Sequence, residues 1–235
     1  MDDPPVRVLL FDVFGTLVDW RSSLIAIGEA TGAAAGVGAD WPGVIDDWRR
    51  AYQPAMDQIR AGAAWRDLDV VQAQTLDAVL ARRDVALPGA GRAALVAGWR
   101  QLAPWPDTRD GLARLRAGHV TATLSNGHLA LLADLLKFAD LRVDVVLSAQ
   151  LAGSYKPDPQ TYLTALRLLD CPPSEAALVA AHPGDLRAAA ALGLRPVFIR
   201  RPLEWGPAAA PARVPDLPGL IEAGGLGELA DLLAG

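Results

Sequence analysis

Short apolar runs alternate with stretches of helical periodicity along most of the chain. Five runs predict buried strands, because each is nearly continuous in apolar residues and too short for a helix; they cover 6–11, 120–124, 143–148, 177–181 and 195–199. Helical spacing predicts helices over 111–117, 128–138, 160–169 and 186–192. Strands that alternate with helices predict an α/β fold with a doubly wound parallel sheet, buried on both faces.

The stretch from residue 20 to residue 98 breaks this rhythm. It is rich in Ala, Trp, Arg and Asp and contains no convincing strand, and its periodicity predicts helices over 24–30, 41–59, 69–82 and 90–102. We therefore expect residues 20–98 to form a helical insertion and residues 1–19 and 99–235 to form the core. The Pro-rich segment 201–219 is expected to loop over the surface, before a short helix within 220–233.

Composition and termini narrow the functional class. The first residues are acidic and their apolar run stops at Asp12, which is not typical of a signal peptide or of a membrane helix of about 20 apolar residues. We therefore expect a cytoplasmic protein without a membrane partner. The formal net charge of -5 argues against a nucleic acid partner, since phosphate binding needs a basic face. The single Cys171 excludes an intrachain disulfide framework and a multi-Cys zinc site.

Lysine is scarce in this chain. Of the 22 Lys and Arg residues, only Lys137 and Lys156 are lysines. Because arginine already serves as the surface cation, a position that keeps lysine is a candidate for chemistry that needs a compact ammonium. Lys137 falls near the end of a predicted helix, where either cation complements the helix dipole.

Polar side chains stand at the carboxyl ends of the predicted strands. Asp12 ends the first strand, and Ser125 and Asn126 end the second. Residues 182–185 follow the fourth strand, and Lys156 lies in the loop after the third. Ligands of open parallel sheets bind at this edge. A single Asp there is often only a helix cap, but polar groups converging from four segments predict a functional site.

Four segments, in this order, resemble the motifs of the haloacid dehalogenase superfamily. The sequence FDVFGTL at 11–17 is similar to the nucleophile motif, and LSNG at 124–127 is similar to the second motif. YKPD at 155–158 matches the third motif, and Asp185 matches the last acidic position of the fourth. The resemblance covers nearly the whole chain. It implies a Rossmann-like core with a cap, and a helical cap after the first motif matches the insertion at 20–98.

Phe14 separates two chemistries within this superfamily. Most members resemble one another in having a second Asp at this position, which protonates a leaving alkoxide in phosphatases that also hold Mg²⁺. Halide is a weak base and needs no acid, so Phe14 leaves halide displacement intact. The fourth motif has one carboxylate, Asp185, where phosphatases usually have two. Both features resemble the L-2-haloacid dehalogenase branch, which implies that neither a metal nor another cofactor takes part.

This resemblance assigns roles to the residues at the strand ends. Asp12 is expected to attack Cα of a small 2-halocarboxylate, expel halide and form an aspartyl ester. Lys156 is expected to keep Asp12 ionised, since a nearby cation lowers a carboxyl pKa. Asp185 is expected to orient Lys156 and to help position the hydrolytic water. Thr16 and Ser125 are expected to orient the carboxylates of Asp12 and substrate.

The halide site is expected to draw on the helical insertion. Arg49 belongs to a Trp-Arg pair similar to that of the branch, and with Asn126 it would stabilise the departing halide; its alternative is a solvated helix face. Trp65 resembles the aromatic residue that contacts halide, and its alternative is ordinary packing within the cap. Tyr162 matches another substrate-binding position of the branch, with simple packing on the sheet as its alternative.

The fourth motif departs from the branch at positions 180–182. The better-known dehalogenases resemble Ser-Ser-Asn where this chain has Ala-Ala-His. Two interpretations of His182 stay open: a base for ester hydrolysis with an unperturbed pKa near 6.5, or a hydrogen-bonding loop residue. Gly184 replaces a usual aromatic residue, which would widen the pocket.

Two other functions also stay open. One is a phosphatase-like hydrolase of the same superfamily, against which Phe14 argues. The other is a non-catalytic relative that binds a small carboxylate, against which the intact Asp12, Asn126, Lys156 and Asp185 argue. An assay of halide release distinguishes a dehalogenase from both of these alternatives. Fluoroacetate is an open substrate, and a homodimer is expected from the resemblance alone.

Overall fold

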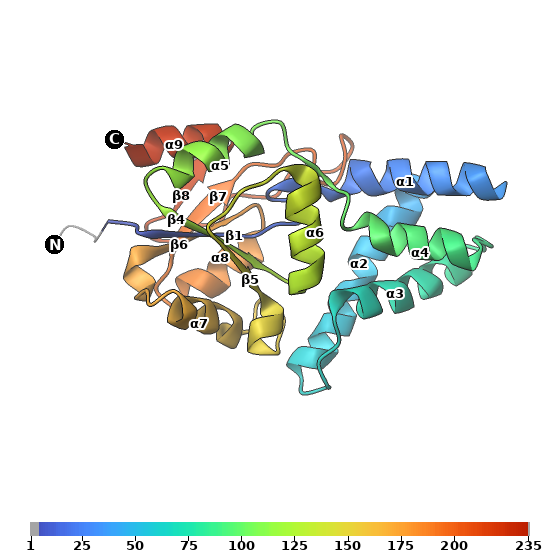
Figure 1. Cartoon of the computed structure of the whole chain (residues 1–235), viewed down its shortest axis with the longest axis horizontal. Coiled ribbons are helices and arrows are strands. Elements are labelled where there is room, and N and C mark those ends of the chain that lie inside the picture. The colour runs from blue at the N-terminus through green and yellow to red at the C-terminus, as the bar shows by residue number, and fades with distance from the viewer. Residues whose placement is uncertain (1–4, 235) are drawn as a thin grey trace.

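The computed structural model describes residues 5–234 and contains a six-stranded parallel sheet (Figure 1). The strand order is β5-β4-β1-β6-β7-β8, so β1 lies inside the sheet between β4 and β6. The predicted α/β fold with a parallel sheet is confirmed. The strands are β1 (Val8–Phe11), β4 (Val120–Ser125), β5 (Val145–Ser148), β6 (Ala176–Ala180), β7 (Arg195–Ile199) and β8 (Ile221–Ala223).

Helices cover both faces of the sheet because successive side chains of β1 point to opposite sides. Leu9 and Phe11 pack in one hydrophobic core with α5, α6 and α9, and Val8 and Leu10 pack in another with α7 and α8. These helices are α5 (Thr108–Arg116), α6 (Leu129–Ala139), α7 (Pro159–Leu168), α8 (Pro183–Ala190) and α9 (Leu226–Ala234). Short 3-10 helices cover Ala149–Ala152 and Pro173–Glu175.

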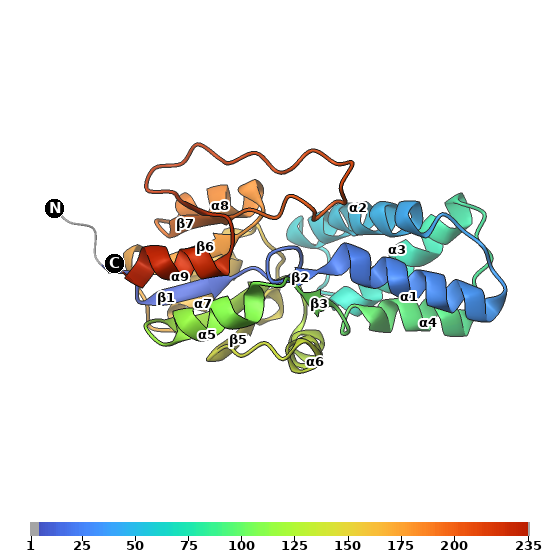
Figure 2. The same cartoon turned by 90° about the horizontal axis from the view of Figure 1, so that it is seen from above.

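Four helices form a separate layer beside the sheet, on the right of Figures 1 and 2. They are α1 (Trp20–Ala35), α2 (Trp41–Arg60), α3 (Leu68–Arg82) and α4 (Gly89–Gly98). Helix α1 packs against α2 and α4, and α3 also packs against both. Gly28 and Gly32 allow the ring of Trp41 to lie close to α1, because a Cβ at either position would come within 2.7 Å of that ring. The helical character predicted for residues 20–98 is therefore present.

The chain leaves and re-enters the sheet region at one place. β2 (Val18–Asp19) pairs antiparallel with β3 (Ala103–Pro104), which ties the two crossing segments together. The carboxylate of Asp19 accepts a hydrogen bond from the Ser22 N–H at 3.0 Å and so caps α1. Trp20, the first residue of α1, is fully buried in the hydrophobic core. The start of α1 is thus fixed by both a cap and packing.

The segment after β7 differs most from expectation. Residues 201–219 were predicted to loop over the surface, but the first of them turn inward. The Arg201 guanidinium donates to the Thr16 carbonyl at 2.9 Å and to the Asp107 carboxylate at 2.7 Å, and Glu204 is buried. The short helix expected within 220–233 is present as α9 (Leu226–Ala234). The strand β8 (Ile221–Ala223) precedes it and was not predicted, because three residues carry too little periodicity to identify a strand. Within residues 5–234, the helices are all too short or too polar to span a bilayer.

Candidate active site

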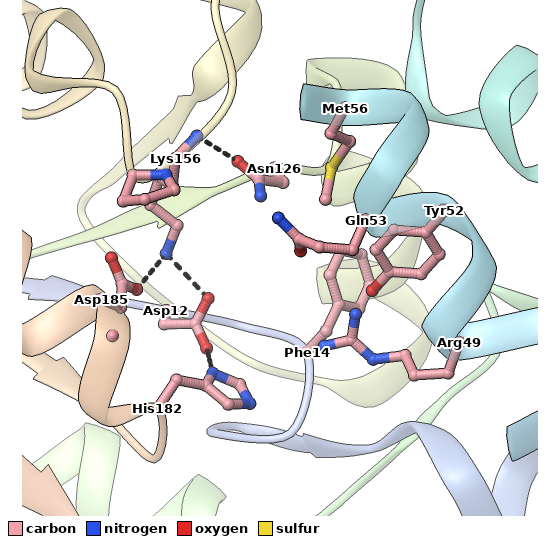
Figure 3. Close-up of a pocket in the computed structure, with 12 residues that line it drawn as sticks. Asp12, Phe14, Arg49, Tyr52, Gln53, Met56, Asn126, Lys156, His182 and Asp185 are labelled. Carbon is pink, nitrogen blue, oxygen red and sulfur yellow. Dashed lines mark hydrogen bonds and ion pairs between the residues drawn. The ribbon is translucent and has the colours of Figure 1, made fainter. Parts of the chain in front are cut away.

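Asp12 is the centre of a buried polar cluster at the carboxyl end of β1 (Figure 3). Its backbone N–H donates to the Val179 carbonyl at 3.0 Å, which fixes the point where the side chain leaves the sheet. Its Oδ1 accepts a hydrogen bond from Lys156 Nζ at 2.9 Å. Its Oδ2 accepts one from the Thr16 hydroxyl at 2.7 Å and lies 2.9 Å from His182 Nδ1. The predicted nucleophile therefore touches three other residues predicted for the site.

Lys156 bridges two carboxylates. Besides Asp12, its Nζ contacts Asp185 Oδ2 at 2.5 Å. The hydroxyl of Tyr162, on α7, donates to the other oxygen of Asp185. The side-chain oxygen of Asn126 accepts a hydrogen bond from the Lys156 backbone N–H at 2.8 Å. The loops after β4 and β5 are thereby joined beside Asp12.

Charge compensation fixes the ionisation of this pair. Burial would raise the pKa of Asp12, but Lys156 and His182 outweigh it and hold that pKa well below its usual range. Burial would lower the pKa of Lys156, but Asp12 and Asp185 raise it. Asp12 is therefore a carboxylate and Lys156 an ammonium at neutral pH.

His182 lies between two carboxylates rather than one. Its Nε2 is 2.9 Å from Glu204 Oε1, and the Trp20 indole N–H donates to the same oxygen at 3.1 Å. Burial works against a charged imidazole, but Glu204 and Asp12 raise the pKa of His182 to about 10. The pKa of His182 therefore lies above its ordinary value near 6.5, because carboxylates contact both of its ring nitrogens.

A pocket of about 330 Å³ opens over this cluster. Part of its wall comes from the loops at the strand ends, and part comes from α2 (Figure 3). Six of the predicted site residues line it, and Tyr52, Gln53 and Met56 on α2 were not predicted. The lining residues are Asp12, Phe14, Arg49, Tyr52, Gln53, Met56, Asn126, Lys156, Pro157, His182, Gly184 and Asp185.

Arg49 brings a buried cation to the wall of the pocket. Its guanidinium carbon lies 4.7 Å from the centre of the Tyr52 ring and 5.3 Å from that of Trp20. Burial lowers the pKa of Arg49, while Glu204 and Asp12 oppose that shift. Within residues 5–234, its buried Nε has no hydrogen-bond partner. A guanidinium with an unused donor suits an anionic ligand.

Three predicted residues lie behind the pocket rather than on its wall. Thr16 is fully buried, and its hydroxyl donates a hydrogen bond to Asp12 Oδ2. Ser125 is fully buried, and its hydroxyl oxygen accepts a hydrogen bond from the Gly127 N–H at 3.2 Å within the turn after β4. Tyr162 is fully buried behind Asp185. Direct contact of Ser125 or Tyr162 with a ligand in the pocket is therefore not supported by their positions.

Trp65 also stands outside the residues that line the pocket. Its ring packs on Tyr155 with ring centres 4.5 Å apart, and its indole N–H donates to Asp67 at 2.8 Å. These contacts favour the alternative of ordinary packing over a contact with halide.

The residues that were missed differ in how visible they are. Tyr52, Gln53 and Met56 follow Arg49 by three, four and seven positions, which places them on one face of α2. That spacing could have identified them once Arg49 was assigned. Glu204 carries no such signal, because it lies in a Pro-rich segment with no motif.

Comparisons with known proteins relate this geometry to one family. A family model described as haloacid dehalogenase-like hydrolase matches residues 6–193. The chain belongs to this family. It is similar to the L-2-haloacid dehalogenase PA0810, with 46% identity, 97% of this chain and 99% of that chain covered, and a TM-score of 0.90. The defluorinating L-2-haloacid dehalogenase Rha0230 is 37% identical over 98% of this chain and 96% of its own, with a TM-score of 0.92. (S)-2-haloacid dehalogenase 1 of Pseudomonas sp. (strain CBS-3) is 28% identical over 207 residues, which cover 84% of this chain and 86% of that protein.

For a haloacid dehalogenase-like hydrolase, this site is poorly suited to a divalent cation. Mg²⁺ needs several oxygen ligands, but the ammonium of Lys156 already bridges the carboxylates of Asp12 and Asp185. Position 14 offers the buried ring of Phe14 instead of a further carboxylate. The arrangement provides an ionised carboxylate held among fixed cations.

Proposed function

We propose that this protein hydrolyses L-2-haloacids to 2-hydroxy acids through an ester on Asp12. The observation that carries the proposal is the ionised carboxylate of Asp12 facing a small pocket whose wall includes Arg49. A phosphatase is disfavoured, because Phe14 cannot protonate a leaving alkoxide. Solved relatives with 46% and 37% identity are named L-2-haloacid dehalogenases.

In the first step, Asp12 displaces halide from Cα of the substrate. The new C–O bond forms as the carbon–halide bond breaks, and backside attack inverts the stereocentre. Lys156 keeps Asp12 ionised, and the hydroxyl of Thr16 fixes its orientation. The halide departs toward the guanidinium of Arg49, with Asn126 on the same pocket wall.

In the second step, water attacks the carbonyl carbon of the Asp12 ester. The bond from that carbon to the alkoxide oxygen breaks, which releases the 2-hydroxy acid and restores the carboxylate. One water is consumed, and one halide ion and one proton are released in each cycle. Asp185 contributes by holding Lys156 beside Asp12.

Halide release in the presence of EDTA tests the proposal. L-2-chloropropionate and chloroacetate are expected to yield chloride, and D-2-chloropropionate serves as the stereochemical control. Asp12→Asn is expected to abolish release and the transient mass increase of the protein. Failure of the unsubstituted protein to release chloride from either substrate, together with Mg²⁺-dependent hydrolysis of phosphomonoesters, would overturn it.

Fluoroacetate is a second substrate that we propose for the same site. Fluoride needs strong hydrogen-bond donors as it leaves, and the buried Arg49 Nε has no partner within the described residues. One relative is described as defluorinating. Fluoride is expected from fluoroacetate more slowly than chloride from chloroacetate, and a fluoride electrode measures it.

The domain organisation is also part of this proposal. We assign residues 1–19 and 99–235 to the catalytic core and residues 20–98 to the cap, with the pocket between strand-end loops and α2. Limited proteolysis at the two crossing segments tests that division. A homodimer, testable by sedimentation, and a cytoplasmic location remain predictions.

A further inference from the structure

The two oxygens of Asp12 have different surroundings. A carboxylate oxygen has two lone pairs for hydrogen bonds. Oδ2 uses both, one toward Thr16 and one toward His182. Oδ1 accepts from Lys156, and among the residues that the structure describes no second donor contacts it. Oδ1 therefore keeps a lone pair for attack, and Oδ2 becomes the carbonyl oxygen of the ester.

We propose that His182 and Thr16 form an oxyanion site at Asp12 Oδ2 for hydrolysis of the ester, with Glu204 as the positioning residue that keeps His182 a hydrogen-bond donor. This inference rests on the proposed function and extends it to the second step. It gives His182 the task of a donor instead of that of a base.

The donor pattern requires a proton on each ring nitrogen of His182. Ionised carboxylates accept hydrogen bonds and cannot donate them. Nδ1 faces Asp12 Oδ2 and Nε2 faces Glu204 Oε1, each at 2.9 Å. Both nitrogens must therefore carry hydrogen, so the ring is an imidazolium. The pKa of His182, raised to about 10 by its two carboxylate partners against the effect of burial, agrees with this geometry.

Thr16 is prepared for the same task. The Ala181 N–H donates to the Thr16 hydroxyl oxygen at 3.0 Å, which leaves the hydroxyl hydrogen directed at Asp12 Oδ2. Thr16 is fully buried and cannot exchange this partner for bulk water. Two preorganised donors on one oxygen are the usual means by which enzymes stabilise the charge of a tetrahedral intermediate.

Glu204 is built into the site although it comes from the segment after β7. It is 3% exposed, and Trp20 donates to the oxygen that faces His182. Gly15 makes the necessary room, because a Cβ there would lie 2.3 Å from Glu204 Oε1. A buried carboxylate without such partners would be costly. Trp20, His182 and the space at Gly15 together fix the position of the Glu204 carboxylate.

The charge on His182 depends most on Glu204 once the ester has formed. Asp12 is then neutral, and Glu204 is the remaining carboxylate in contact with the ring. The cations of Lys156 and Arg49 near this cluster oppose the charge of the imidazolium. Asp185 is occupied by Lys156 and Tyr162 and does not contact the ring. Removal of the charge of Glu204 should therefore lower the pKa of His182 in the ester.

The hydrolytic step balances without a proton on or off His182. Water oxygen bonds to Cγ of Asp12 while the carbonyl pair moves onto Oδ2, where Thr16 and His182 stabilise the charge. Collapse breaks the bond between Cγ and Oδ1, so Oδ1 leaves in the product. One proton of the water ends on the product hydroxyl. The other is released when the new carboxyl group of Asp12 ionises beside Lys156.

The decisive measurement is the decay of the ester in Glu204→Gln as a function of pH. The ester is formed with L-2-chloropropionate in a single turnover, and its loss is followed by the mass of the intact protein. Glutamine keeps the size and an acceptor oxygen but removes the charge. We expect the ester to decay at the same rate in Glu204→Gln and in the unsubstituted protein near pH 6. Near pH 8.5, we expect decay in Glu204→Gln to be at least about tenfold slower, because its imidazolium loses one proton and with it the positive charge.

Opposite results have distinct meanings. Faster decay of Glu204→Gln than of the unsubstituted protein near pH 8.5, where only the variant has a neutral ring, would indicate that His182 acts as a base. An unchanged pH profile would show that Glu204 does not control the charge of the ring. Either result overturns the proposal. Glu175→Gln, the same change at a solvent-accessible pair with Arg7, is the matched control and should leave the profile unchanged. If the unsubstituted protein forms no ester and releases no halide, the proposed function itself has failed.

Substitution of His182 provides a test that does not depend on Glu204. An asparagine amide can donate to Oδ2 but cannot accept a proton at neutral pH. His182→Asn is expected to hydrolyse the ester within about tenfold of the normal rate, whereas His182→Ala should be slower by about 10²–10³. Accumulation of ester to the same extent in both variants would overturn the donor role.

Discussion

Replacement of Lys156 by methionine tests the charge balance of the site most directly. Lys156 is 6% exposed, and its Nζ lies 2.9 Å from Asp12 Oδ1 and 2.5 Å from Asp185 Oδ2. Unit charges about 4 Å apart attract by about 4 kcal/mol at an effective dielectric of about 20. Breaking a buried pair costs about 3–5 kcal/mol, because the partner keeps its charge. We expect Lys156→Met to lower the free energy of unfolding by about 3–5 kcal/mol at pH 8.

The loss of stability should shrink as the pH falls. The pKa of Asp12 is depressed in the folded protein, so its stabilising effect is present above the unfolded pKa of about 3.9 and is lost only below that value. Without Lys156, the pKa of the buried carboxylates rises, and the folded variant takes up a proton that its unfolded chain does not. The difference in free energy of unfolding between the unsubstituted protein and Lys156→Met then narrows by up to about 1.4 kcal/mol per pH unit between pH 7 and pH 5.

Urea unfolding followed by tryptophan fluorescence at pH 8, 7, 6 and 5 measures this difference. Lys137→Met is the matched control, since Lys137 is exposed at the end of α6 and its loss should change stability by less than about 0.5 kcal/mol. The predicted stabilising effect of Lys156 would be refuted if Lys156→Met were as stable as the control at pH 8. It would also be refuted if its loss of stability were the same at every pH.

Two further substitutions examine the walls of the site. Gly15→Ala places a Cβ 2.3 Å from Glu204 Oε1 at a φ of +90°. Thermal unfolding should therefore show a free energy of unfolding lower by about 1–3 kcal/mol. Gly118→Ala, with nothing within 4 Å of its Cβ, should show no such loss. Arg49→Lys keeps the charge but loses the planar guanidinium, and it should slow ester formation by about tenfold to a hundredfold while leaving ester decay unchanged. The mass of the intact protein after rapid mixing separates the two rates, and an equal effect on both would contradict the assignment of Arg49 to halide.

The parallel sheet was predictable because its strands are short, apolar and separated by helices. The expected strands at 120–124 and 195–199 correspond to β4 and β7 within one residue at either end. Helix boundaries were less accurate, since α1 begins four residues before the expected start at Leu24 and continues five beyond Ala30. Its ends are set by the cap at Asp19 and by Gly36 in the left-handed region, not by its apolar face.

The position of each candidate site residue was predictable where the sheet itself provides the geometry. Asp12, Asn126 and Asp185 lie at or just after the ends of β1, β4 and β6, and parallel strands bring such ends together. Lys156 could be chosen over Lys137 because it lies in a motif after β5. Contacts that depend on side-chain packing were not accessible in this way.

Glu204 is the clearest case of a contact that the sequence conceals. Its importance depends on Gly15, which has no side chain, on Trp20, and on His182, and each of these is at least 22 positions away from Glu204 in the chain. Each looks ordinary alone: a turn glycine, a buried tryptophan, an acidic residue in a Pro-rich loop. Together they hold a carboxylate against an imidazole, which turns a histidine of ordinary pKa into a fixed hydrogen-bond donor. His182, which replaces the usual asparagine, and the space left by Gly15 are therefore two parts of one arrangement. Without the space at Gly15, Glu204 could not reach His182, and without His182 that space would serve no purpose.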